Sequence, residues 1–137
     1  MTIKEVSELC NLSADTLRYY EKVGMIPPIG RTAGGIRNYS DSDVQWIELA
    51  KCMRSAGLPV EVMTKYLELY REGDSTIEAR YELLAEQQRI LLQQQKQIAA
   101  TLERISYKVE KYKEAMKTGH LKWGDPRDCE ANGAKIN

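Results

Sequence analysis

Residues 13–39 read SADTLRYYEKVGMIPPIGRTAGGIRNY, and this stretch decides the fold of the N-terminal half of the chain. A short helix with an exposed Arg-Tyr-Tyr step is followed by a ribbon in which Pro and Gly exclude helix and predict a two-stranded wing. Between residues 16 and 39, four Lys or Arg stand against one Glu, although the whole chain has no net charge. Cations neutralise phosphates and hydroxyls fix register, so the segment suits a polyanion. On charge alone, a solvated helix and hairpin is the simpler interpretation.

The segment before this helix favours the interpretation that the region binds nucleic acid. Ile3, Val6 and Leu9 share one face of a first short helix. Asn11 stands where a tight turn needs a residue that tolerates positive φ, and Ser13 is a good N-cap for the second helix. Two short helices joined by a turn of about 3–4 residues make a helix-turn-helix, whose second helix can enter the major groove. The second-helix residues in or beside the groove would be Thr16, Arg18, Tyr19 and Tyr20.

Four motifs in order resemble the MerR family of bacterial transcription regulators. They are TIKEVS at 2–7, TLRYYE at 16–21, GMIPP at 24–28 and RNY at 37–39. Asn11 departs from the family, which usually has Gly there, but it is conformationally compatible.

The resemblance implies a mainly α fold with a small β wing. A winged helix-turn-helix DNA-binding domain would span 1–73, a coiled-coil dimerisation helix 74–116, and a C-terminal tail 117–137. It also implies binding at an overlong promoter spacer and distortion of the DNA so that RNA polymerase can use the promoter. The DNA contacts predicted in this way are Ser13, Thr16, Arg18, Tyr19, Tyr20, Arg37 and Tyr39.

Composition limits the class of protein. The 137 residues are enough for one small domain with an appendage, and no apolar run approaches the ~18–20 residues of a membrane span. The N-terminus has no apolar signal segment, and three widely spaced cysteines form no disulfide framework, so a cytoplasmic location is predicted. With one His and no nucleophile–base pair, an enzyme is not expected, and no cofactor is predicted.

Capping signals delimit the later helices. Ser40 and Asp43 predict a capping box at the start of a third helix, which Gly57 ends. Ser75 and Glu78 predict a second box at the start of the long helix. The apolar face of the third helix is predicted to consist of Trp46, Leu49, Ala50 and Met53.

The long helix, predicted over 76–116, carries a coiled-coil seam. At 1.5 Å per residue it would be ~60 Å long, too long to bury its stripe on a domain of this size. No second long helix could complete an intramolecular bundle, so a homodimer is expected, and the family resemblance implies that it is antiparallel. One seam row is Ile77, Leu84, Leu91, Ile98, Ile105 and Tyr112, and the other is Tyr81, Gln88, Gln95, Leu102, Val109 and Met116.

The three cysteines differ in their surroundings. Cys10 falls where the first two helices pack and is predicted to be a small buried side chain. Cys129 lies in the tail with no activating group nearby in sequence. Cys52 lies at the margin of the third helix's apolar face, and its neighbours Lys51 and Arg54 point elsewhere on a helix. From spacing alone, Cys52 is better explained as an inert residue at the edge of the core.

A second resemblance reverses that preference. The segment 46–58, WIELAKCMRSAGL, is similar to the AdhR-like or NmlR-like subgroup of MerR regulators. These respond to reactive carbonyls and thiol stress through a single cysteine in this helix, a role that carries over to Cys52. A cation that activates the thiol would come from another helix or from the partner subunit.

Two alternatives remain at this point. A metal-responsive regulator would need ligands in the tail or at the dimer interface, but Cys129 and His120 alone are a weak pair for a soft metal, so no metal site is predicted. A purely structural coiled-coil adaptor would explain the long helix but leave the Arg-Tyr-Tyr helix and the wing unused.

Overall fold

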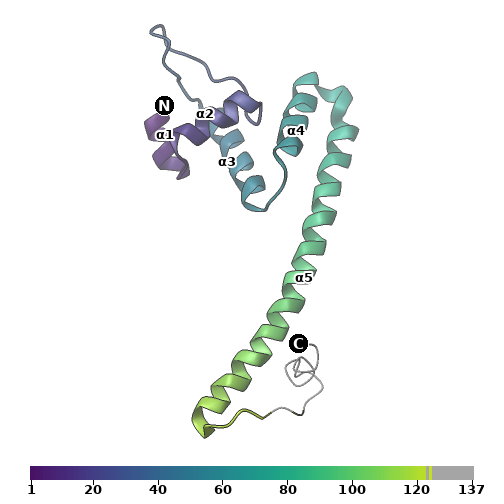
Figure 1. The fold of residues 1–137 in the computed structure, drawn as a ribbon. Helices are drawn as coiled ribbons and strands as arrows, with labels where there is room; N and C mark the ends of the chain where they lie inside the picture. Colours follow the sequence, from purple (N-terminus) through teal and green to yellow (C-terminus); the bar gives the residue numbers. More distant parts are fainter. Residues whose placement is uncertain (123, 125–137) are drawn as a thin grey trace. The chain divides into compact units, whose positions relative to one another are not determined.

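A computed structural model describes residues 1–122 and 124 of the chain. It divides into two compact units, Met1–Arg89 and Ile90–Asn137. The fold is mainly helical with a long C-terminal helix, as predicted (Figure 1). The elements in order are α1 (Ile3–Cys10), α2 (Ala14–Val23), α3 (Asp41–Ser55), α4 (Val60–Glu72), the 3-10 turn η1 (Asp74–Thr76) and α5 (Ile77–Thr118).

The predicted helix-turn-helix is confirmed in its backbone and caps. Asn11 adopts the left-handed conformation with φ 53°, which reverses the chain between α1 and α2. The Ser13 hydroxyl accepts a hydrogen bond from the Thr16 N–H at 3.1 Å and so caps α2. Gly24, with φ 85°, ends α2 in a conformation that Gly adopts without steric cost.

The predicted apolar face of α1 needs one correction. Val6 is fully buried, but Leu9 is 61% exposed and Cys10 is buried instead. At about 100° per residue, Cys10 lies within about 20° of Ile3 around the helix axis, whereas Leu9 lies about 120° away. Residues placed every three positions turn progressively away from the buried face, because the helix repeats every ~3.6 residues. The predicted face of Ile3, Val6 and Leu9 did not allow for this rotation.

The wing is smaller than the predicted two-stranded ribbon. Within residues 1–122, its pairing consists of one antiparallel bridge between Arg31 and Arg37. Two further backbone hydrogen bonds, from Thr32 N–H to the Ile36 carbonyl at 2.8 Å and from Asn38 N–H to the Gly30 carbonyl at 2.7 Å, extend the pairing. These bonds give the loop a defined shape without a regular strand.

Helix α3 begins with the predicted capping box between Ser40 and Asp43. Its buried face differs from the prediction, because Ile47 is fully buried and Leu49 is 38% exposed. The face is centred on Ala50, and Leu49 lies about 100° from it around the helix. This correction matters for Cys52, because Leu49 is one turn away on the same exposed side.

The predicted capping box between Ser75 and Glu78 is wrong. The chain forms the 3-10 turn η1 before α5, and the buried hydroxyl is that of Thr76. This hydroxyl bonds the carbonyls of Leu69 and Gly73, and Arg80 donates to both the Thr76 hydroxyl and the Gly73 carbonyl. The first turn of α5 is therefore tied to the end of α4 by contacts that local capping rules do not include.

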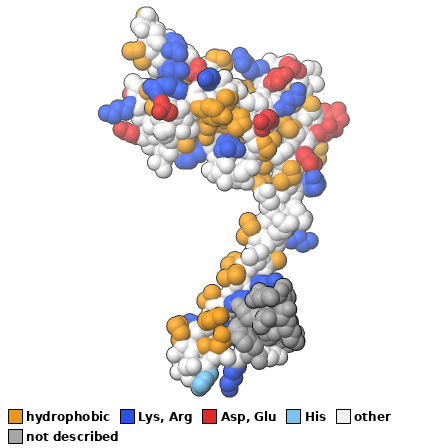
Figure 2. Space-filling model, in the orientation of Figure 1, with side chains coloured by type: hydrophobic (Ala, Val, Ile, Leu, Met, Phe, Trp, Pro, Cys, Tyr) orange, Lys and Arg blue, Asp and Glu red, His pale blue; other side chains and the backbone are white. Residues whose placement is uncertain are grey.

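Helix α5 exposes most of the apolar rows that the heptads predict. In the second unit, hydrophobic side chains follow one another along the helix surface (Figure 2). None of the described helices is long and apolar enough to cross a membrane. The exposed seam side chains, at 40% or more of full exposure, are Ile77, Tyr81, Leu84, Ile98, Leu102, Ile105, Val109, Tyr112 and Met116.

Candidate nucleic-acid interface and candidate sensor thiol

Helix α2 presents part of the predicted contact set to solvent. Tyr19 is 47% exposed, and the Arg18 side chain is 49% exposed. Arg18 Nη1 lies 2.9 Å from Asp15 Oδ1 in an exposed ion pair, which is weak and easily exchanged for a phosphate. The hydroxyls of Ser13 and Thr16 lie 2.8 Å apart at the start of the helix. Lys and Arg side chains also gather along the wing and at its base (Figure 2).

Two of the predicted contacts are core residues. Tyr20 is 6% exposed and Tyr39 is 2% exposed, so the expectation that Tyr20 is exposed is wrong. Burial raises the pKa of both phenols. The Tyr39 hydroxyl is buried without a hydrogen-bond partner among the described residues. Both rings therefore belong to the packing that supports α2 and the wing, and contact of their hydroxyls with DNA stays a prediction.

The prediction also overlooked Glu21, which links α2 to the wing. Its Oε1 accepts a hydrogen bond from Arg37 Nε at 2.8 Å, and its Oε2 accepts one from the Ile29 N–H at 3.0 Å. Burial alone would raise the pKa of this carboxyl, but the bonds from Arg37 and Ile29 outweigh burial and hold the pKa below its usual value. A signal was present in the sequence, since Glu21 is the one acid in an otherwise basic stretch.

Cys52 and Cys10 have opposite environments. Cys52 is exposed on α3, whereas Cys10 is 1% exposed, as predicted. Burial, with a hydrogen bond to Glu48, raises the pKa of the Cys10 thiol from 9.0 to about 11. The two cations next to Cys52 in sequence are engaged elsewhere, since Lys51 Nζ donates to the Cys10 carbonyl and Arg54 Nη1 to the Leu58 carbonyl, each at 2.6 Å.

The two thiols should therefore differ in reactivity. When the native protein is treated with iodoacetamide at pH 8 and digested, Cys52 should be modified well before Cys10, because alkylation requires an accessible thiolate. Cys10 should react only after denaturation, which serves as the control for peptide recovery. Modification of Cys10 in the native protein at a rate equal to that of Cys52 would contradict the assigned environments.

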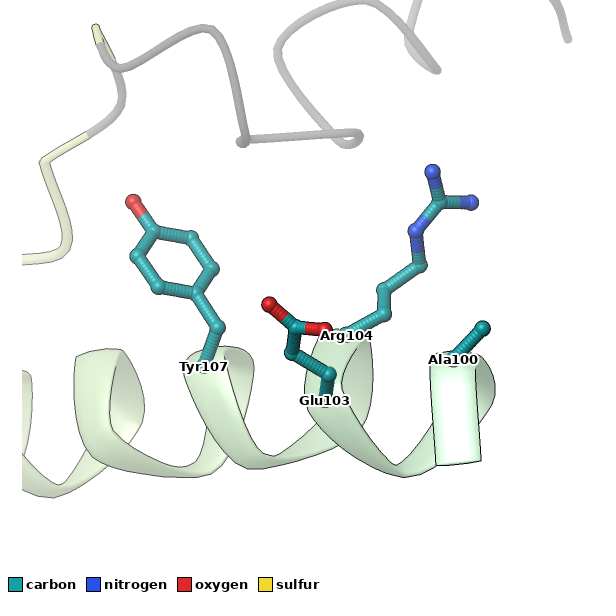
Figure 3. A pocket seen from close by; sticks show the side chains of 4 residues that line it. All are labelled: Ala100, Glu103, Arg104 and Tyr107. Carbon is teal, nitrogen blue, oxygen red and sulfur yellow. The ribbon is translucent and has the colours of Figure 1, made fainter. Parts of the chain in front are cut away.

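The described residues offer little support for a metal site or a small-molecule site. Over residues 1–122 and 124, no group of three or more His, Cys, Asp or Glu side chains could hold a metal ion. Cys129, named above as a possible metal ligand, lies outside the described residues. A shallow pocket is lined by four side chains that project from a single stretch of α5 (Figure 3). These are Ala100, Glu103, Arg104 and Tyr107.

Comparison with known proteins decides the family. Residues 1–69 match the family model described as MerR HTH family regulatory protein. The chain belongs to the MerR family. It is 48% identical to the HTH-type transcriptional regulator AdhR of Bacillus subtilis over 93 residues, which cover 68% of this chain and 66% of the relative.

Two further similarities extend over most of the chain. An HTH-type transcriptional regulator of Haemophilus influenzae is 32% identical over 88% of this chain and 90% of its own length. The solved structure of HiNmlR, a MerR family regulator lacking the sensor domain, bound to promoter DNA, superposes with a TM-score of 0.80 at 32% identity, over 88% of this chain and 95% of that one. The protein is therefore a transcriptional regulator of this family, a role that is not enzymatic.

Proposed function

We propose that the protein is a homodimeric regulator that binds and distorts promoter DNA and responds to electrophiles or thiol stress through Cys52. The observation that carries the DNA-binding part is the pairing of an exposed Arg-Tyr face on α2 with a basic wing held beside it by Glu21. The relative HiNmlR, which was solved with promoter DNA, supports the same use of this unit.

On this proposal, α2 enters the major groove and the wing follows the phosphate backbone. Arg18 and Tyr19 have the exposure that contact requires, and Thr16 lies in the first turn of the helix, which reaches base edges in helix-turn-helix proteins. Arg37 would hold a phosphate from the base of the wing. Distortion of the DNA would bring an overlong promoter spacer into a form that RNA polymerase accepts, at an elastic cost of order 1–6 kcal/mol.

A dimer is supported by the exposed seam of α5, because such a stripe is stable in water only when another helix covers it. Charge supports the antiparallel orientation. Residues 60–86 carry seven Asp or Glu and three Lys or Arg, whereas residues 104–122 carry six Lys or Arg and two Glu. An antiparallel pair would bring the acidic stretch of each chain toward the basic stretch of the other, and a parallel pair would oppose like charges.

The thiol part of the proposal rests on accessibility and on relatives. Cys52 is exposed in the single chain, whereas Cys10 is buried with a raised pKa. The region that is 48% identical to AdhR spans 93 of the 137 residues, and any stretch of that length includes Cys52. An adduct or mixed disulfide at one thiol needs no second cysteine in the same chain.

Selection from random DNA tests the DNA-binding part. Wild-type protein should enrich a two-fold symmetric operator, and its affinity should fall steeply with salt, because phosphate contacts release counterions. Arg37→Ala should weaken binding to all sequences and reduce the salt slope by about 1, whereas Thr16→Ala should shift the preference among sequences. Recovery of no palindrome would contradict the proposal.

A further inference from the structure

The charges on α2 pose a problem for a DNA-binding surface. Glu21 lies in its last turn, and a carboxylate on the proposed DNA-binding surface would repel phosphates. Between residues 16 and 39 it is the one negative side chain beside four Lys or Arg. A neutral side chain at this position would raise the local positive charge. The contacts of Glu21 show what the carboxylate does instead.

Glu21 holds both sides of the wing with its two oxygens. Oε1 receives Arg37 Nε on the outgoing side, and Oε2 receives the Ile29 N–H on the incoming side. The carboxylate side chain is 16% exposed and that of Arg37 is 23% exposed, so solvent screens this ion pair less than it screens a surface pair. One side chain of α2 therefore sets where the wing begins and where it ends.

The same contact orients the guanidinium of Arg37. Arginine has five N–H donors in a rigid planar fork, and Glu21 occupies the Nε donor. Within the part of the chain that the structure describes, the Nη groups of Arg37 donate no hydrogen bond. With Nε fixed, the plane of the fork is fixed too, and the Nη groups are available for a phosphate.

We propose that Glu21 is a positioning residue for DNA binding, which holds Arg37 and the wing in register with α2. The inference rests on the proposed function, in which α2 and the wing bind one duplex together. It predicts that removal of a negative charge from the DNA-binding surface weakens the complex. If Glu21 acted only through its charge, its removal would instead strengthen DNA binding.

Asp15 provides a matched control. It is also on α2 and also pairs with an arginine, Arg18, at 2.9 Å. Its side chain is 94% exposed, however, and the pair joins neighbouring turns of one helix rather than two segments of the fold. Asp15→Asn removes the same charge as Glu21→Gln and leaves the wing untouched.

The experiment measures fluorescence anisotropy of the selected operator over a range of salt concentrations. Glu21→Gln should bind about 10-fold more weakly than wild type, the effect of about one charged hydrogen bond. Gln keeps one acceptor, so one of the two wing partners would face an amide donor. Asp15→Asn should bind as tightly as wild type or more tightly. Binding by Glu21→Gln that equals or exceeds that of wild type would overturn the proposal.

A double mutant distinguishes positioning from a general loss of structure. In an Arg37→Ala background, Glu21→Gln should weaken binding less than about 2-fold, because Arg37 is already gone and the remaining amide oxygen can still accept the Ile29 N–H. A loss as large as in the wild-type background would overturn the assignment.

Arg37→Lys is the alternative test variant if Glu21→Gln does not fold. It keeps the charge but lacks the planar fork, so it should bind about 10-fold more weakly, and full binding would contradict the proposal. A wild-type protein that binds no operator would contradict the proposed function itself.

Discussion

Leu91→Asp combined with Ile98→Asp is expected to convert the proposed dimer into monomers at micromolar concentration. Both residues belong to the seam row that repeats every seven residues, and Ile98 is 67% exposed in the single chain. In the dimer, each substitution would place an unpaired carboxylate between apolar side chains, which costs about 3–5 kcal/mol per buried charge. Two such charges should raise the dimer dissociation constant at least about 1000-fold.

Sedimentation velocity measures this change directly. Gln93→Asp combined with Ala100→Asp is the matched control, because it places two carboxylates seven residues apart on an exposed face of the same helix, outside the seam. The control should remain dimeric. Affinity for a two-fold operator should fall with dissociation, because each half-site would then bind alone. A monomeric wild type, or a seam variant that stays dimeric, would contradict the proposed assembly.

Cys52→Ser is expected to abolish the transcriptional response to aldehydes or disulfide stress while DNA binding is retained. Serine is close in size to cysteine but forms no thioether or disulfide, so the reactive group is lost with little change in shape. A reporter gene under the selected operator measures the response, and anisotropy measures binding. Cys129→Ser and Cys10→Ala should respond nearly as wild type does.

The structure changes how an adduct at Cys52 would act. An adduct that crowded packed neighbours such as Leu49 and Met53 would cost about 1–3 kcal/mol. Met53 is buried, but Leu49 is 38% exposed and Cys52 is exposed beside it, so the single chain leaves room for an adduct on that side. We therefore propose that the adduct acts through the exposed surface of α3 around Cys52, with a coupling of about 5–150-fold. An intact response in Cys52→Ser would exclude this mechanism.

Local rules were enough for the turn between the first two helices and for the caps at the start of α2 and α3. Ser13, Ser40 and Asn11 lie at the caps and the turn that their side chains and backbone preferences predict. These features depend on interactions within four residues, which a sequence displays directly. The seam of α5 is equally visible, because a period of seven residues is a property of one helix.

Contacts between distant segments were not predictable in this way. Glu21 and Arg37 are sixteen residues apart, and only the folded wing brings them within 2.8 Å. Tyr20 and Tyr19 are adjacent and chemically identical, yet one is 6% exposed and the other 47%. Helix periodicity separates the two rings, but which one faces the core depends on where α3 and the wing pack. The sequence alone thus determined the helices, the family resemblance and the apolar seam on which the proposed dimer rests, whereas tertiary packing decided which polar side chains face solvent and which hold the wing.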